Sequence, residues 1–294
     1  MKPRRTIVIT GSNTGIGASC AVQLARPGVH LVLACRSEEK AQPVLEVVRQ
    51  KGATAAFAKL DLGSLAASSA AGAELAASCE SIDLLVNNAG LGGHHGTTRD
   101  GFEIQFGTNH LGHFAFTMPL LARVERANGR IVNVSSGNHR KAKGIPWERL
   151  TEPTRSLTGM GEYGVSKLCN VLFTAELRRR HASIEAVSMN PGRIASDIWR
   201  KIPQPLRAIF PMLLAMKPVD VGGAYLVHAC EAPLEGPEAP LYFDKGVAVP
   251  VNPLALREDL ASELWEYSLK AVAAASPDRP APRRTTPVAL EAAG

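Results

Sequence analysis

Short apolar runs alternate with longer amphipathic segments through most of the chain, and this rhythm restricts the fold more than any other feature. The runs are rich in Val, Ile and Leu with little polar alternation, which is typical of strands covered on both faces. The expected strands are 6–10, 30–35, 53–59, 82–87, 130–134, 184–189 and 241–243, and the expected helices are 15–27, 38–51, 64–79, 101–126, 162–181 and 218–230. Repeated strand–helix–strand units predict a doubly wound α/β fold, in which helices cover both faces of one parallel sheet of about seven strands.

Composition and cysteine usage exclude several classes of protein. The chain has 294 residues, a net charge of +6 and five cysteines. The cysteines are odd in number, scattered and without a CxxC pair, so we expect no disulfide framework and no metal site. The charge forms no stripe of the kind that binds nucleic acid, and no apolar run is long enough for a transmembrane segment. We expect a cytoplasmic protein with one domain at 1–275 and a disordered Pro/Arg/Ala-rich tail at 276–294, and a homodimer is left open.

A glycine-rich turn with the spacing GxxxGxG separates the first expected strand from the first expected helix. Glycine permits positive φ and close backbone approach, and a helix N-terminus offers free N–H groups to a pyrophosphate. A glycine turn alone can serve geometry only, but the strand–turn–helix context favours a dinucleotide site. The expected cofactor contacts in this turn are Gly11, Ser12, Asn13, Thr14, Gly15, Ile16 and Gly17.

Four motifs in this order resemble the short-chain dehydrogenase/reductase family. They are the TGxxxGIG turn, Asn87-Asn88-Ala89-Gly90 after the fourth strand, the YxxxK pair of Tyr163 and Lys167, and Pro191-Gly192 after the sixth strand. The stretch from Phe106 to Phe114 is similar to the retinol-dehydrogenase-like branch, which also includes WW-domain oxidoreductases and is related to light-dependent protochlorophyllide reductases. The resemblance spans roughly residues 5–272. It implies a Rossmann-type fold and a nicotinamide-dependent alcohol dehydrogenase or ketoreductase.

The end of the second expected strand bears on which nicotinamide cofactor is used. No Asp or Glu stands there to accept from a ribose 2′-OH, whereas Arg36 can pair with a 2′-phosphate. The alternative is that Arg36 is only a solvated charge. The resemblance favours NADP(H) for the triplet Ala-Cys-Arg. It also implies cofactor contacts at Asp61, Leu62, Asn88, Ala89, Gly90, Tyr163, Lys167, Pro191, Gly192, Ile194 and Ser196.

Tyr163 and Lys167 stand four residues apart on one expected helix, so their side chains point the same way. A phenol with a reference pKa of about 10 is a poor acid at neutral pH, and a nearby ammonium lowers that pKa. An ordinary exposed Tyr/Lys pair has the same spacing, but together with the other motifs the pair indicates catalysis.

Two further catalytic positions follow from the resemblance. Ser135 and Ser136 end the fifth strand, at the edge where open α/β sheets bind ligands. The family pattern puts the hydrogen bond to the substrate oxygen on Ser136 and leaves Ser135 a structural role. Asn109 matches the family's asparagine, which holds a water in a proton relay from the lysine. The alternative for Asn109 is a polar core amide satisfied by backbone.

The expected reaction is hydride transfer between NADPH and a carbonyl carbon, with Tyr163 as proton donor and the reverse direction as alcohol oxidation. An apolar, proline-interrupted segment at 195–218 predicts a lid, and hence a bulky, mostly apolar ketone, aldehyde or alcohol. The rival interpretation is that this segment packs on the core or on a partner. His94, His95 and Arg193 lie near the expected mouth of the site, and the sequence leaves their contacts open. A non-catalytic NADP(H)-binding sensor on the same fold is the second function class.

Overall fold

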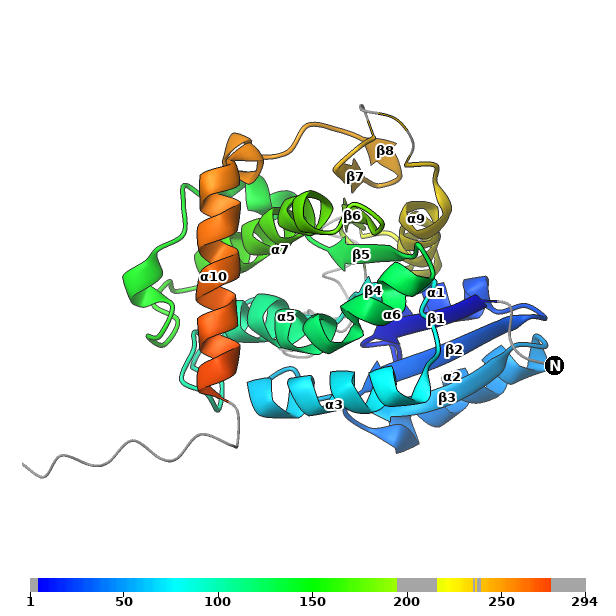
Figure 1. Ribbon diagram of the computed structural model, residues 1–294. Coiled ribbons are helices and arrows are strands. Elements are labelled where there is room, and N and C mark those ends of the chain that lie inside the picture. The colour runs from blue at the N-terminus through cyan, green and yellow to red at the C-terminus, as the bar shows by residue number, and fades with distance from the viewer. Residues whose placement is uncertain (1–4, 195–215, 235, 237–238, 276–294) are drawn as a thin grey trace, which may run out of the picture.

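A single eight-stranded sheet organises the protein (Figure 1). The structure is a computed structural model that describes residues 5–194, 216–234, 236 and 239–275. The strand order is β3-β2-β1-β4-β5-β6-β7-β8, and all neighbouring pairs are parallel except β7 and β8. The strands are β1 (Arg5–Thr10), β2 (Val29–Cys35), β3 (Thr54–Lys59), β4 (Leu84–Asn87), β5 (Arg130–Val134), β6 (Glu185–Asn190), β7 (Tyr242–Asp244) and β8 (Val247–Ala248).

The sheet has one strand more than predicted. Strand β8 is only two residues long and pairs antiparallel with β7 through the turn at Lys245 and Gly246. Both turn residues have positive φ, 52° and 81°, as a tight hairpin requires. Because both residues of β8 are exposed, no buried apolar run reveals it in the sequence. The predicted parallel, doubly wound architecture is confirmed, and the strand count of about seven is corrected to eight.

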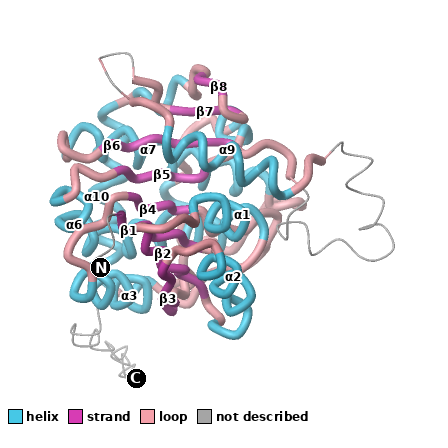
Figure 2. Tube along the Cα trace, turned by 90° about the vertical axis from the view of Figure 1, so that its right-hand side faces the viewer, coloured by secondary structure: helices cyan, strands magenta, loops and turns pink. Residues whose placement is uncertain are grey.

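Helices cover both faces of the sheet (Figure 2). One face carries α1 (Gly15–Leu24), α2 (Glu38–Gln50) and α9 (Val219–Glu231), and the other carries α3 (Leu65–Ser78), α5 (Gly112–Thr117), α6 (Leu121–Arg126), α7 (Met160–Arg180) and α10 (Glu258–Ala274). Successive residues of each strand supply opposite faces: in β1, Ile7 and Ile9 join the first core and Val8 the second. This two-sided burial explains why the strands show so little polar alternation.

The helix predicted at 101–126 is interrupted. It consists of α4 (Ile104–Phe106), a π turn η1 (Gly107–Leu111), α5, a 3₁₀ turn η2 (Met118–Leu120) and α6. Pro119 lies in the 3₁₀ turn, where its missing N–H disrupts regular helix bonding. Other short 3₁₀ turns are η3 (Gly137–Lys141), η4 (Trp147–Arg149) and η6 (Pro253–Leu256).

Two predicted segments lie outside the described residues. They are the lid at 195–218, except for its last three positions, and the tail at 276–294. Within the part of the chain that the structure describes, no helix has both the length and the apolar character needed to cross a membrane.

Candidate active site

The carboxyl ends of β1, β4, β5 and β6 lie side by side, because these strands are consecutive neighbours in the sheet. The strand order reverses between β1 and β4, and ligands of open α/β sheets bind at such a point. Three of the four motifs follow these strand ends, and Lys167 of the fourth reaches the end of β5 from helix α7, so the structure gathers them along one edge of the sheet.

The glycine turn after β1 has the geometry that its spacing predicts. Gly11 and Gly15 have φ of 64° and 58°, a region that other residues rarely adopt. A Cβ on Gly17 would lie 2.4 Å from Asn88 Nδ2 and 2.5 Å from the Gly11 oxygen. Helix α1 starts at Gly15, and its first N–H groups have no partner within the helix. This turn therefore fits a pyrophosphate through backbone N–H groups and the positive end of the helix dipole.

The side chains of Ser12, in the glycine turn, and of Asn88, after β4, bond main-chain oxygens at the start of this turn. Ser12 is fully buried and donates its hydroxyl proton to the Ile9 oxygen at 2.8 Å. Asn88 Nδ2 donates to the Thr10 oxygen at 2.8 Å and to the Gly11 oxygen at 3.3 Å. Ser12 and Asn88 thus hold the shape of the turn with their side chains.

Thr10 joins the glycine turn to the helix that carries Asn109, a link that sequence reasoning missed. Its Oγ1 accepts from the N–H groups of Asn88 and Ala89 at 2.9 and 3.0 Å and contacts His113 Nε2 at 2.9 Å. His113 Nδ1 lies 2.9 Å from the main-chain carbonyl oxygen of Asn109. Because a carbonyl oxygen can only accept, Nδ1 carries the ring proton and Nε2 accepts from the Thr10 hydroxyl. Burial lowers the pKa of His113 to about 4, which keeps the ring neutral.

Tyr163 and Lys167 lie in the first turns of α7 and are both almost fully buried. The Lys167 ammonium nitrogen lies 5.7 Å from the centroid of the Tyr163 ring and donates to the Val134 oxygen at 2.9 Å. Lys167 is therefore held between the tyrosine and the end of β5.

The expected lowering of the tyrosine pKa is not what the geometry gives. Burial raises the pKa of Tyr163, and a hydrogen bond with the Ser136 side chain opposes this rise only in part. Burial also lowers the pKa of Lys167 to about 7. At neutral pH the lysine therefore carries only part of its charge, and it cannot pull the tyrosine pKa down as a full ammonium would.

The two serines after β5 have different hydrogen-bond partners, and their catalytic and structural roles stay predictions. Ser135 is buried and donates its hydroxyl proton to the Lys167 oxygen at 2.7 Å, so it ties β5 to α7. Ser136 is half-buried, and its Oγ accepts from the Asn138 N–H at 3.3 Å. The Ser136 hydroxyl also bonds the Tyr163 phenol, so its proton lies beside the tyrosine that the family pattern assigns to catalysis.

Asn109 lies in the π turn η1 and is fully buried. Its Oδ1 accepts from the Leu91 N–H at 2.9 Å, and its Nδ2 donates to the Leu91 oxygen and to Ser166 Oγ. A Cβ on Gly90 would lie 3.1 Å from Asn109 Oδ1 and 3.5 Å from Lys167 Nζ, so Gly90 separates the two side chains closely. The amide is satisfied by protein groups, which matches the alternative noted from the sequence, and its water-holding role stays a prediction.

The predicted adenosine-side residues lie at the carboxyl ends of β2 and β3. Arg36 is exposed and has no ion-pair partner among the described residues. Asp61 accepts from the Gly63 N–H at 3.1 Å and pairs with Arg99 at 3.4 Å. Leu62 is buried, and a Cβ on Gly112 would come within 3.0 Å of its Cα. Arg36 is therefore available to pair with an anion at this end of the site.

The loop after β6 lies near the glycine turn, because Ile194 of the loop and Ile16 of the turn lie against the same residue of α9. Asn190 Oδ1 accepts from the Gly192 N–H at 3.1 Å, and its Nδ2 donates to Asp244 at 2.9 Å. Pro191 is buried, and Gly192 has φ of 82°. The side chains of Ile194 and Ile16 both lie against Gly222 in α9, where no Cβ would fit between them. Arg193 is exposed, and Ser196 lies outside the described residues.

His94 and His95 belong to a loop fastened to the segment before α7. His95 Nε2 lies 3.0 Å from the Ser156 oxygen, and the His94 oxygen accepts from Thr154 Oγ1. Buried Gln105 connects the same two segments, since its amide accepts from the Gly93 N–H and donates to the Gly159 oxygen. The two histidines therefore lie in a loop that is hydrogen-bonded to the segment before α7, and their place at the mouth of the site stays a prediction.

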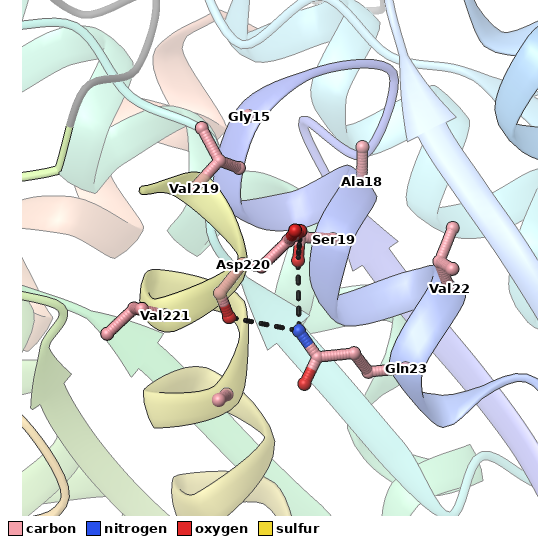
Figure 3. Close-up of a pocket in the computed structure, with 9 residues that line it drawn as sticks. Gly15, Ala18, Ser19, Val22, Gln23, Val219, Asp220 and Val221 are labelled. Atoms are coloured by element: carbon pink, nitrogen blue, oxygen red, sulfur yellow. Dashed lines mark hydrogen bonds between the residues drawn. The ribbon is translucent and has the colours of Figure 1, made fainter. Parts of the chain in front are cut away.

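A cavity lies beside the glycine turn, between α1 and α9 (Figure 3). Its volume is about 770 Å³, and its lining combines Val22, Val219 and Val221 with the polar Ser19, Gln23 and Asp220. In Figure 3, Gln23 of α1 reaches across to Asp220 of α9, and its side-chain nitrogen also donates to Ser19 one turn earlier on α1. Neither Tyr163 nor Ser136 lines it, so this cavity is separate from the predicted catalytic residues.

The glycine turn gives a direct test of the cofactor site. Gly17→Ala is expected to lower NADPH affinity about tenfold or more, because the new methyl group must displace Asn88 or the Gly11 carbonyl. Fluorescence titration with NADPH measures this loss. The control is Gly161→Ala in α7, where the nearest atom to a new Cβ is 3.7 Å away. Equal affinities for the two variants would contradict the assignment.

Comparisons with known proteins agree with this geometry. A family model described as short chain dehydrogenase matches residues 5–148. Retinol dehydrogenase 13 of Homo sapiens is 36% identical over 304 residues, which cover 96% of this chain and 89% of that protein.

Two solved structures extend the comparison to three dimensions. A putative uncharacterized protein from Mycobacterium Paratuberculosis is 32% identical, with a TM-score of 0.72 over 92% of this chain and 94% of that one. A short-chain dehydrogenase from Sphingobium yanoikuyae in complex with NADPH has a TM-score of 0.64 over 95% of this chain and 99% of that one. Its sequence is only 20% identical, so this second likeness concerns the fold.

Proposed function

This chain belongs to the short-chain dehydrogenase family, on its retinol-dehydrogenase-like branch, and from that premise we propose that it is an NADP(H)-dependent oxidoreductase that interconverts a carbonyl and an alcohol on a bulky, mostly apolar substrate. The observation that carries the proposal is the grouping of Ser136, Tyr163 and Lys167 beside the glycine turn. Family membership supports the reaction class, and the arrangement of these side chains supports catalysis by this chain.

The proposed mechanism assigns each residue an atom to act on. NADPH, when bound, supplies the hydride that reduces the carbonyl carbon. Tyr163 gives its phenolic proton to the developing alkoxide, and the Ser136 hydroxyl donates a hydrogen bond to the same oxygen. Its raised pKa keeps Tyr163 protonated at neutral pH, as a proton donor for the reducing direction must be. Lys167, next to the tyrosine ring, would hold the nicotinamide ribose and return a proton to the Tyr163 phenolate.

Two observations support NADP(H) over NAD(H). No carboxylate stands at the end of β2, and the exposed Arg36 guanidinium there is free to pair with a 2′-phosphate. The structural neighbour from Sphingobium yanoikuyae is in complex with NADPH.

Arg36→Ala is therefore expected to raise KM for NADPH about tenfold or more and to leave KM for NADH nearly unchanged, because only NADPH loses a charge-assisted contact. Steady-state kinetics with both cofactors measure this. Arg26→Ala is the control, since Arg26 lies before the opposite end of β2 and pairs with Glu231. Equal use of the two cofactors by the unmodified protein would refute the assignment.

The substrate class rests on two further observations. A relative covered over most of its length is named a retinol dehydrogenase, and the sequence predicts an apolar lid at 195–218. A panel of retinoid, steroid and polycyclic carbonyls, set against sugars and small hydroxy acids, tests this class through NADPH consumption. Higher kcat/KM for the small polar compounds would overturn it. Tight NADPH binding without turnover on any compound would favour the alternative, a non-catalytic NADP(H)-binding sensor.

A further inference from the structure

The turn that follows Ser136 contains a buried histidine that the mechanism above does not use. His139 is fully buried in η3, the 3₁₀ turn that begins directly after Ser136. Its main-chain N–H donates to the main-chain carbonyl oxygen of Ser136 at 3.0 Å, and its Nδ1 lies 2.7 Å from the same carbonyl oxygen. A carbonyl oxygen can only accept, so Nδ1 carries the ring proton. The Ser136 carbonyl thus receives two donors from one residue.

The other ring nitrogen of His139 is also occupied. Nε2 lies 3.3 Å from the N–H of Asn252, so it acts as an acceptor. The side-chain amide of Asn252 also donates to the main-chain oxygens of His139 and Ala142, at 3.0 and 2.9 Å. Asn252 is itself buried and lies just before η6, so a segment 113 residues away fixes the orientation of the imidazole.

The protonation state follows from these partners. An imidazolium would present a second donor to the Asn252 N–H, which would break that contact. Burial lowers the pKa of His139, the nearby Arg140 lowers it further, and the Ser136 carbonyl and Asp244 oppose the change. The ring is therefore neutral at neutral pH, with its proton directed at Ser136.

These bonds act on the serine's hydroxyl through its backbone. Ser136 has extended backbone with φ of −161° and ψ of 154°, and its Oγ accepts from the Asn138 N–H within the same turn. The Ser136 carbonyl and the Asn138 N–H both belong to that short turn, so a tilt of the carbonyl also moves Oγ. A small displacement of a group that contacts the reacting atoms lowers the rate steeply.

We propose that His139, held by Asn252, is a positioning residue that fixes the Ser136 carbonyl and so directs the Ser136 hydroxyl at the substrate oxygen. The inference rests on the proposed function, in which Ser136 contacts that oxygen. It assigns His139 no contact with substrate or cofactor.

Two substitutions separate the two ends of the imidazole. His139→Asn can place an amide N–H near the Nδ1 position and keep the donor to Ser136. His139→Gln places its amide near the Nε2 position, so it keeps a partner for Asn252 and loses the donor to Ser136. With NADPH and all-trans-retinal, His139→Gln is expected to lower kcat about tenfold, and His139→Asn to recover most of that loss. The Kd for NADPH should stay unchanged in both variants. His181→Gln, at the far end of α7, is the matched control.

A double-mutant cycle with Ser136→Ala decides between positioning and general structural support. If His139 acts through the serine hydroxyl, His139→Gln should cause no further loss of kcat once Ser136 is alanine. Independent, multiplicative losses would overturn the proposal, as would equal kcat for His139→Asn and His139→Gln. Unchanged kcat for Ser136→Ala alone would remove the premise about Ser136 and the inference with it.

A readout that needs no turnover distinguishes this inference from the proposed function. Nitrogen-15 NMR of histidine-labelled protein reports which ring nitrogen of His139 carries the proton. A proton on Nδ1, shielded from exchange, is the expected result. A proton on Nε2 would overturn the inference even in an active enzyme. An inactive protein with Nδ1 protonated would refute the proposed function and leave the bond to Ser136 in place.

Discussion

Tyr163→Phe is expected to lower kcat for carbonyl reduction by about 10²–10⁴-fold, the usual contribution of a positioned general acid. The side chain is only 8% exposed, and a phenyl ring fills the same space without the hydroxyl. The fold and NADPH binding should therefore persist. Steady-state turnover, NADPH titration and thermal unfolding of the same samples measure the three properties separately.

A second buried tyrosine provides the matched control. Tyr242 is fully buried in β7, and among the described residues its hydroxyl has no hydrogen-bond partner. Removing a buried hydroxyl without a partner costs little stability and can add some, so Tyr242→Phe should leave turnover unchanged. If the two phenylalanine variants had similar kcat, Tyr163 would not be the proton donor.

The core of the sheet could be predicted because its strands are buried on both faces and so carry unbroken apolar runs. Strand β8 and helix α10 are not among the expected strands and helices, for opposite reasons. Strand β8 is short and exposed, so it has no apolar signal. Helix α10 does have an apolar signal in the sequence. Its buried residues recur at helical spacing, at Leu260, Leu264, Trp265 and Ser268, and acidic residues occupy its first turn. This spacing is a local signal for a helix, although 258–274 is not among the expected helices.

The site was predictable where its chemistry follows from local spacing. The glycines of the turn and the four-residue separation of Tyr163 and Lys167 are local features. The links through His113 and His139 are not, because their partners Thr10 and Asn252 lie more than 100 residues away in the sequence. The pKa of Lys167 could not be predicted either, because burial depends on the complete fold.

The burial of Lys167 has a second consequence, for stability. The pKa of Lys167 is about 7 in the folded protein, against an ordinary lysine value of 10.5 that holds in the unfolded chain. Between these two values the unfolded chain binds more protons than the folded one, so this residue makes the free energy of unfolding rise with pH. Below pH 7 the full cost of burying the lysine remains, on the order of 5 kcal/mol.

Lys167→Met is therefore expected to stabilise the protein and to inactivate it. Methionine removes the cost of burying an ammonium, and the Val134 oxygen keeps the Asn170 amide as a donor at 3.1 Å. After the loss of one hydrogen bond, we expect a net gain of about 3 kcal/mol at pH 7, fading as the pH approaches 10.5. Turnover should fall about 10²-fold or more, because the tyrosine loses its proton source.

Denaturant unfolding across this pH range, with turnover measured on the same variant, tests both effects. Lys270→Met, an exposed substitution on α10, is the control and should show no pH-dependent gain. A stability difference for Lys167→Met that did not change with pH would show that Lys167 keeps an ordinary pKa in the folded protein. In that case a full ammonium would stand beside Tyr163 at neutral pH and would lower the pKa of the tyrosine.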